Sequence, residues 1–228
     1  AASARFAGII TAREWAEPLD IGSVGAWDVA LLGGNRMAPP DPQLGPKWFP
    51  NARLNFAENL LRYRDDRPAL IFWNEQGSQS RLSYAELFAA VGAFAAALRA
   101  QGVVVGDRVA GFMPNLPETV VAMLATASIG AIWSSCSPDF GVNGILDRFG
   151  QIQPRVLISA SSYRYAGRVI DCMARVREIV DRIPEIERTV VVPYLARDID
   201  VSGIRGAVGW SDFVGGRSAT PAFERLPF

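Results

Sequence analysis

The first segment with residue types suited to ligand chemistry spans residues 134–150, where an apolar run gives way to small and polar residues. Ser137 or Asp139 could cap a helix that begins near Val142, and Gly141 would leave the backbone open to close approach. The free N–H groups at such a helix start attract an anion. The sequence therefore predicts a strand, a tight turn and a helix that could bind a phosphate, with an ordinary capped turn as the alternative.

The second segment is residues 163–168, one predicted strand further along the chain. Here Arg164 and Arg168 flank Gly167 at the predicted start of a long helix over residues 167–183. Two guanidinium groups beside free helix N–H groups suit a phosphate or pyrophosphate. The alternative is a solvent-exposed helix face with unpaired arginines.

Residues for acid–base or metal chemistry are scarce. The chain has no His, which removes the commonest general base, the Ser/His and Cys/His pairs and most zinc sites. Cys136 and Cys172 lack metal-ligand spacing and are expected to be small buried hydrophobic residues in a reducing compartment. The glycine-rich loops of the standard nucleotide-binding motifs are also absent from the sequence.

The composition limits the class of protein. The 228 residues are half hydrophobic, enough for one largish domain with a substantial core. The formal net charge of zero argues against nucleic acid as the main partner. No signal peptide is visible at the start, and the apolar region over residues 119–133 is too short to cross a membrane. We therefore expect a cytoplasmic protein with small-molecule ligands.

The elements that would position the two segments follow from residue spacing. Residues 1–50, rich in Gly and Pro, are predicted to be an irregular N-terminal segment with a short helix near residues 6–15. Residues 51–228 are predicted to form one α/β subdomain. It opens with a helix over residues 55–62 and a β-hairpin built from residues 69–74 and about 80–82. Ser83 and Glu86 then form a capping box, which starts a helix that Gly102 ends.

Strands and helices alternate after this point. The predicted strands cover residues 108–113, 131–135, 155–159 and 189–192, and the predicted helices cover residues 117–128, 142–151, 167–183 and 210–214. Three successive strand–helix–strand units predict an α/β fold with a mostly parallel sheet flanked by helices.

Three strings in the chain resemble a known family. Residues 48–61, 114–118 and 129–141 are similar to the acetoacetate-activating branch of the acyl-CoA synthetase, or adenylate-forming, superfamily. The resemblance runs from about Phe6 to Phe228 and is weakest over residues 16–46. It implies the N-terminal subdomain of the adenylate-forming enzyme fold.

The resemblance also implies a reaction and a binding site. Family members activate a carboxylic acid with ATP and magnesium as an acyl-adenylate, and then transfer the acyl group to CoA. A short Arg-x-Gly-Arg-like motif contacts CoA phosphates in related enzymes, and residues 165–168 occupy its place here, with Arg164 displaced by one position. Gly141 lies in the turn that borders the CoA channel. The resemblance therefore implies CoA-binding roles for Gly141, Arg164, Gly167 and Arg168.

Other parts of the family pattern are missing from this chain. The ATP-phosphate loop, the magnesium carboxylate, the acyl pocket and the catalytic Lys are expected beyond Phe228, and Lys47 has no claim to that last role. We therefore expect no catalytic, ATP-binding or metal-binding residue here, no tightly bound cofactor, and no adenylate formation by this chain alone. Two alternatives stay open: an enzyme for another short acid (acetate, propionate or 3-hydroxybutyrate), or a stand-alone, non-catalytic α/β binding module.

Overall fold

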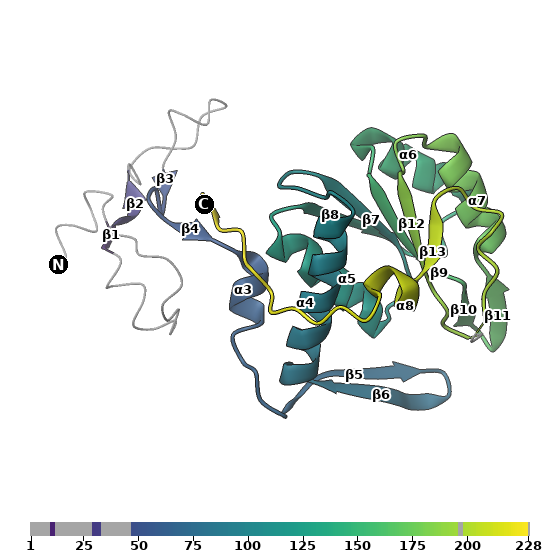
Figure 1. The fold of residues 1–228 in the computed structure, drawn as a ribbon, viewed down its shortest axis with the longest axis horizontal. Coiled ribbons are helices and arrows are strands. Elements are labelled where there is room, and N and C mark those ends of the chain that lie inside the picture. Colours follow the sequence, from purple (N-terminus) through teal and green to yellow (C-terminus); the bar gives the residue numbers. More distant parts are fainter. Residues whose placement is uncertain (1–9, 12–28, 33–46, 196–197, 228) are drawn as a thin grey trace. The chain divides into compact units, whose positions relative to one another are not determined.

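The computed structural model describes residues 10–11, 29–32, 47–195 and 198–227 (Figure 1). The chain separates into two compact units, one made of residues 1–59 and 224–228, the other of residues 60–223. Both candidate segments lie in the second, larger unit.

The smaller unit contains short antiparallel strands. One sheet has the order β1 (Ile10–Thr11), β2 (Val29–Leu32) and β3 (Lys47–Trp48), and β4 (Arg53–Leu54) pairs with β14 (Leu226–Pro227) next to helix α3 (Phe56–Leu60). Arg225 secures the second pair, because its guanidinium forms an ion pair with Glu58 at 2.6 Å. The prediction of an irregular segment is therefore wrong for β1, β2 and β3. The helix expected near residues 6–15 is wrong at Ile10 and Thr11, and its other positions lie outside the described residues.

The larger unit begins with a hairpin and a long helix, as predicted. Strand β5 (Pro68–Asn74) pairs antiparallel with β6 (Gly77–Ser83), and α4 (Tyr84–Ala100) follows. The capping box is confirmed: Glu86 N–H donates to Ser83 Oγ at 3.2 Å, and Ser83 N–H donates to Glu86 Oε2 at 2.7 Å. Gly102, at φ 84°, follows the helix in the left-handed region that glycine adopts without steric cost.

A five-stranded parallel sheet forms the centre of this unit, which confirms the predicted α/β class. Its order is β13 (Ala207–Gly209), β12 (Arg188–Val192), β9 (Val156–Ala160), β7 (Arg108–Phe112) and β8 (Ile132–Cys136). All five residues of β9 are buried, as expected for a central parallel strand covered on both faces. The predicted strands are thus correct to within a residue or two at their ends.

Helices cover both faces of the sheet (Figure 1). One face carries α6 (Val142–Ile152) and α7 (Met173–Arg182), which share a buried cluster with the sheet around Phe112, Ile145, Phe149 and Ile179. The other carries α4, α5 (Pro117–Ser128) and α8 (Trp210–Val214), where Trp210 stacks on Phe94 at 4.3 Å between ring centroids. No helix in the described part of the chain is long and apolar enough to pass through a membrane.

The long helix predicted over residues 167–183 is wrong in its first third. Strands β10 (Ser162–Tyr165) and β11 (Arg168–Asp171) instead form an antiparallel hairpin, and α7 begins only at Met173. The cause is the turn between the strands, where Ala166 and Gly167 adopt φ values of 49° and 74°. Two successive residues with positive φ match the right-handed twist of a tight hairpin and cannot continue a right-handed helix.

Candidate functional site

The candidate site lies at the carboxyl ends of the parallel strands. The chain passes from β7 outward to β8 and then crosses to β9 on the other side of β7, so the strand order reverses between β7 and β9. In open α/β sheets, ligands bind outside the carboxyl ends of the strands at such a reversal. The loops that leave this edge contain both segments that the sequence marked as candidates.

A cavity of about 270 Å³ opens at this edge, lined by Met113, Pro114, Asn115, Thr119, Ser135, Cys136 and Ser137. The hydrogen bond from Met113 N–H to the Cys136 carbonyl, at 3.2 Å, joins the loop after β7 to the end of β8. Thr119 stiffens the first loop, because its hydroxyl donates to the Pro114 carbonyl at 2.8 Å. The lining therefore offers hydroxyl and amide groups on a fixed backbone, which suits a neutral polar ligand.

Neither cysteine is poised as a nucleophile. Cys136 and Cys172 are free and buried, which confirms the prediction from their spacing. Burial raises the pKa of both thiols, that of Cys172 to about 11. Since the thiolate is the reactive form, both remain protonated near neutral pH. Within the described residues, no three His, Cys, Asp or Glu side chains gather into a group that could hold a metal ion.

The turn after β8 differs from the prediction in its cap. Gly141 is the N-cap residue of α6, at φ −66° and ψ 159°, and no side chain caps the helix. Ser137 and Asp139 instead bond to each other, the hydroxyl donating to Asp139 Oδ2 at 2.9 Å. They lie too early in the turn to reach the first helical N–H groups. No side chain therefore bonds to the first N–H groups of α6. Free N–H groups at a helix start are the donors that an anion can use.

Two residues that the sequence reasoning missed hold this turn in place. Arg175, on α7, donates to the Pro138 carbonyl at 2.6 Å. Tyr163, on β10, is buried, and its pKa is raised by that burial and by its hydrogen bond to Asp139, against an opposing effect of Arg175. Because both contacts join residues that are far apart in the chain, no local sequence signal could have identified them.

The second segment places its two arginines apart. Residues that pair across an antiparallel ladder share a face, and Tyr165 pairs with Arg168 while Arg164 pairs with Val169. Arg164 and Arg168 therefore project from opposite faces of the β10–β11 hairpin. The prediction that the two guanidinium groups stand together beside helix N–H groups is wrong, because neither residue lies at a helix start.

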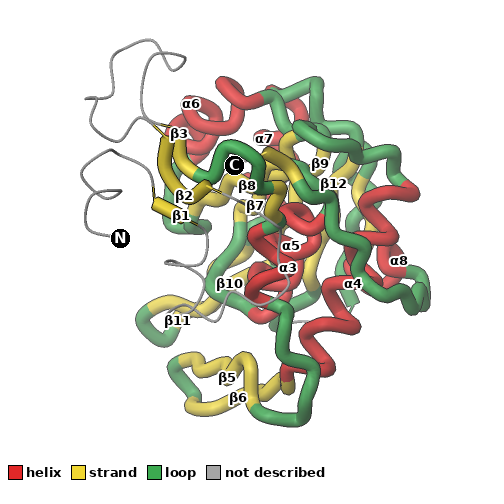
Figure 2. Tube along the Cα trace, turned by 90° about the vertical axis from the view of Figure 1, so that its left-hand side faces the viewer, coloured by secondary structure: helices red, strands yellow, loops and turns green. Residues whose placement is uncertain are grey.

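The tip of this hairpin meets the tip of the β5–β6 hairpin (Figure 2). The Gly167 N–H donates to Glu75 Oε2 at 2.8 Å, and Asn74 Nδ2 donates to the Tyr194 hydroxyl, just after β12, at 3.0 Å. Phe72 adds an edge-to-face contact with the Tyr194 ring, with 6.0 Å between centroids. The β5–β6 hairpin is therefore fixed to two loops at the carboxyl edge of the sheet.

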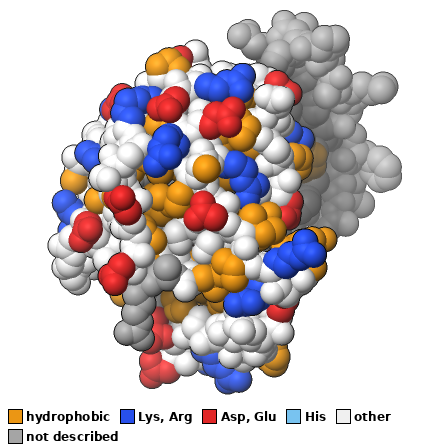
Figure 3. Space-filling view, turned by 90° about the vertical axis from the view of Figure 1, so that its right-hand side faces the viewer, with side chains coloured by type: hydrophobic (Ala, Val, Ile, Leu, Met, Phe, Trp, Pro, Cys, Tyr) orange, Lys and Arg blue, Asp and Glu red, His pale blue; other side chains and the backbone are white. Residues whose placement is uncertain are grey.

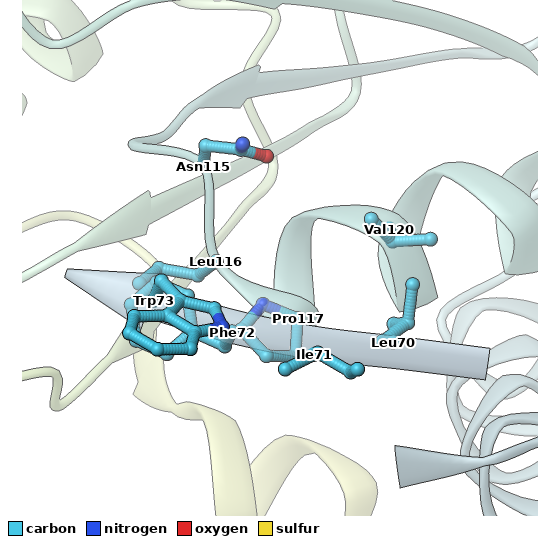
Figure 4. A pocket seen from close by; sticks show the side chains of 8 residues that line it. All are labelled: Leu70, Ile71, Phe72, Trp73, Asn115, Leu116, Pro117 and Val120. Carbon is cyan, nitrogen blue, oxygen red and sulfur yellow. The ribbon is translucent and has the colours of Figure 1, made fainter. Parts of the chain in front are cut away.

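A second cavity, of about 280 Å³, adjoins β5 (Figure 4). It is lined by Leu70, Ile71, Phe72 and Trp73 from β5 and by Asn115, Leu116, Pro117 and Val120 from the start of α5. Asn115 lines both cavities. Figure 3 shows basic and acidic side chains interspersed on one face of the molecule, in keeping with the zero net charge.

Comparison with known proteins identifies the family. Residues 56–201 match the family model described as AMP-binding enzyme. The chain belongs to this family. Its AMP-binding region covers most of the larger unit, including both cavities and both hairpins.

Within this family, the chain is similar to several acetoacetyl-CoA synthetases. An acetoacetyl-coenzyme A synthetase from Rhizobium meliloti (strain 1021) is 49% identical over 87% of this chain and 30% of its own length. An acetoacetyl-CoA synthetase from Macaca fascicularis is 40% identical over 98% of this chain and 32% of its own length. The solved structure of acetoacetyl-CoA synthetase from Streptomyces lividans superposes with a TM-score of 0.82 at 36% identity, covering 94% of this chain and 32% of that one. The chain thus spans about 30% of the length of the relatives it matches.

Proposed function

We propose that this chain is part of an acid–thiol ligase that activates acetoacetate with ATP through an acyl-adenylate and transfers the acyl group to CoA. The observation that carries the proposal is the similarity to acetoacetyl-CoA synthetases, which reaches 49% identity and extends over up to 98% of this chain. The TM-score of 0.82 to such an enzyme supports the same reading.

Within that enzyme, the carboxyl edge of the sheet forms one wall of the CoA site. Arg168 is exposed at the start of β11, where its guanidinium can pair with a phosphate, and Gly167 offers a backbone N–H beside it. Gly141 lies on the same edge, and a methyl group placed on it would meet no atom within 4 Å, so a ligand can pass close to its backbone. Arg164 acts from the other face of the hairpin, as a separate contact.

This chain contributes binding and no chemical step. In the part of the chain that the structure describes, no three His, Cys, Asp or Glu side chains form a group that could hold a metal ion. The sequence has no His, and both cysteine thiols are protonated near neutral pH. The groups for adenylate formation then belong to the part of the relatives that this chain does not span. We therefore propose that the chain by itself forms no acyl-adenylate.

A substrate panel tests the proposed acid. The full-length protein that carries this segment would be assayed for CoA thioester formation from acetoacetate, acetate, propionate and 3-hydroxybutyrate, with ATP and magnesium. We expect the highest kcat/KM with acetoacetate. A higher value with another acid would assign the enzyme to that acid, and thioester formation from none of them would favour the non-catalytic binding module.

A further inference from the structure

The Gly167 amide already has an anionic partner. In a two-residue hairpin turn whose central residues both have positive φ, the amide of the second turn residue is not used by the strand ladder. Gly167 occupies that position, at φ 74°, and its N–H donates to the Glu75 carboxylate at 2.8 Å. The N–H that the proposed function assigns to a CoA phosphate is therefore bonded to a side chain of the same chain.

Glu75 is presented to this amide by a well-fixed turn. It lies in the connection between β5 and β6, where Asn74 pairs with Gly77 and Gln76 N–H donates to Asn74 Oδ1 at 2.8 Å. The hydrogen bond from Asn74 to Tyr194 attaches the same turn to the loop after β12. These contacts fix the backbone on both sides of Glu75, and its exposed side chain reaches the Gly167 N–H from there.

We propose that Glu75 is an internal competitor for the anion site at Gly167. Its carboxylate holds the amide donor in the free protein, and a phosphate of CoA must displace it to bind there. A phosphate and a carboxylate cannot share one N–H donor, and two anions at hydrogen-bonding distance from the same amide repel each other. Glu75 therefore lowers the affinity of this edge for CoA and for other phosphates. The inference rests on the proposed function in taking CoA as the ligand.

Two substitutions test whether Glu75 competes with a CoA phosphate or only attaches one hairpin to the other. Glu75→Gln removes the charge and keeps a carbonyl oxygen that can accept from Gly167, whereas Glu75→Ala removes both. If Glu75 competes with the phosphate, both variants of the full-length enzyme bind CoA more tightly, and we expect KM for CoA to fall by about three- to tenfold, the size of a hydrogen bond to a charged group at an exposed site. ATP–pyrophosphate exchange, which does not require CoA, should be unchanged. Glu178→Gln, on the exposed face of α7, removes the same charge elsewhere and should leave KM for CoA unaltered.

A second measurement does not depend on catalysis. CoA titrated into the 228-residue chain should shift the amide NMR signal of Gly167, and the midpoint of that shift should move to lower CoA concentration in Glu75→Gln. Three results would overturn the proposal: no shift at Gly167, the same midpoint in the variant, or weaker CoA binding by Glu75→Ala with an unchanged Glu75→Gln, which would make Glu75 a structural tether. Absence of thioester formation by the wild-type enzyme would contradict the proposed function instead, and the titration would still decide the role of Glu75.

Discussion

At the scale of single residues, the proposed contacts of Arg168 and Gly167 with CoA lie at the tip of the β10–β11 hairpin. Replacing Arg168 by Ala in the full-length enzyme should raise KM for CoA about tenfold or more, since a charge-assisted hydrogen bond to phosphate contributes roughly 1.5–3 kcal/mol. Adenylate formation, followed by ATP–pyrophosphate exchange, should remain nearly intact because no adenylate contact is assigned to this residue.

Arg164→Ala is the matched comparison for Arg168→Ala. It removes the same charge from the same hairpin, but from the face opposite Arg168. We expect a smaller effect on KM for CoA than that of Arg168→Ala. Equal effects would contradict the separation of the two side chains by the strand pairing, and an unchanged CoA dependence in Arg168→Ala would return Arg168 to an ordinary exposed arginine.

The residue types at this site could be predicted from the sequence, but their partners could not. Gly141 lies in the turn before α6, as its sequence context indicated, whereas Gly167, which was predicted at a helix start, lies in the turn of the β10–β11 hairpin. The prediction that Ser137 or Asp139 caps α6 was wrong, because those two side chains bond to each other. The contact between Glu75 and Gly167 joins residues far apart in the chain, and only the assembled fold brings them together.

At the scale of elements, a close contact between α4 and the segment near residue 219 gives a test of packing. A methyl group on Gly92 would overlap the Ala219 carbonyl, which is backbone and cannot move aside as a flexible side chain would. Gly92→Ala should therefore lower the free energy of unfolding by about 1–3 kcal/mol, the usual cost of overpacking a filled site. Urea unfolding of the 228-residue chain measures this directly.

Gly150→Ala is the control for Gly92→Ala. Gly150 lies in the last part of α6, and a methyl group there meets no atom within 4 Å. Alanine should stabilise the helix at this position by up to about 1 kcal/mol, because it loses less backbone entropy on folding than glycine. Destabilisation by both substitutions to the same degree would show that α4 does not pack closely against residue 219.

The amino ends of the parallel strands carry an ion-pair network that should make stability depend on pH. Arg155 pairs with Asp107 at 2.7 Å and with Glu187 at 2.8 Å. Burial alone would raise the pKa of Asp107, but the hydrogen bonds from Val104 N–H and Arg155 outweigh it and hold the pKa below its ordinary value of 3.8. A carboxyl whose folded pKa is depressed stabilises the fold above its unfolded pKa, and that stabilisation is lost as pH falls through the folded pKa.

Asp107→Asn tests this network. At pH 7 the variant should lose about 1–3 kcal/mol of unfolding free energy, the usual contribution of hydrogen bonds to a charged group. Between pH 5 and about pH 2, its stability should fall less steeply than that of the wild type, because one carboxyl with a depressed pKa is gone. Urea unfolding at several pH values gives both quantities, and parallel pH curves for the two proteins would contradict the role assigned to Asp107.

Residue spacing and capping signals predicted most helices and strands. They gave the wrong result where the same residues fitted both a helix and a strand. The capping box at Ser83 and Glu86 is complete in the sequence, so the start of α4 was predicted correctly. Val169 and Ile170 fit the apolar period of the helix that follows, which favoured one long helix. The turn at Ala166 and Gly167 and the pairing with β10 placed them in a strand instead.

At the scale of the whole molecule, the parallel sheet follows from the alternation of strands and helices, and this alternation could be predicted from the sequence. The strand order is less accessible, because alternation predicts neighbouring parallel strands but does not say where their order reverses. That reversal, between β7 and β9, defines the candidate site. The activity proposed for the whole protein is inferred from similar proteins, and this chain spans about 30% of their length.

The most direct test of the proposed function is acetoacetate-dependent exchange of labelled pyrophosphate into ATP. It would be measured for the full-length protein and for the 228-residue chain under the same conditions. We expect exchange by the full-length protein that requires acetoacetate, and none by the chain alone. Exchange by the 228-residue chain, or its absence from the full-length protein, would contradict the proposed function.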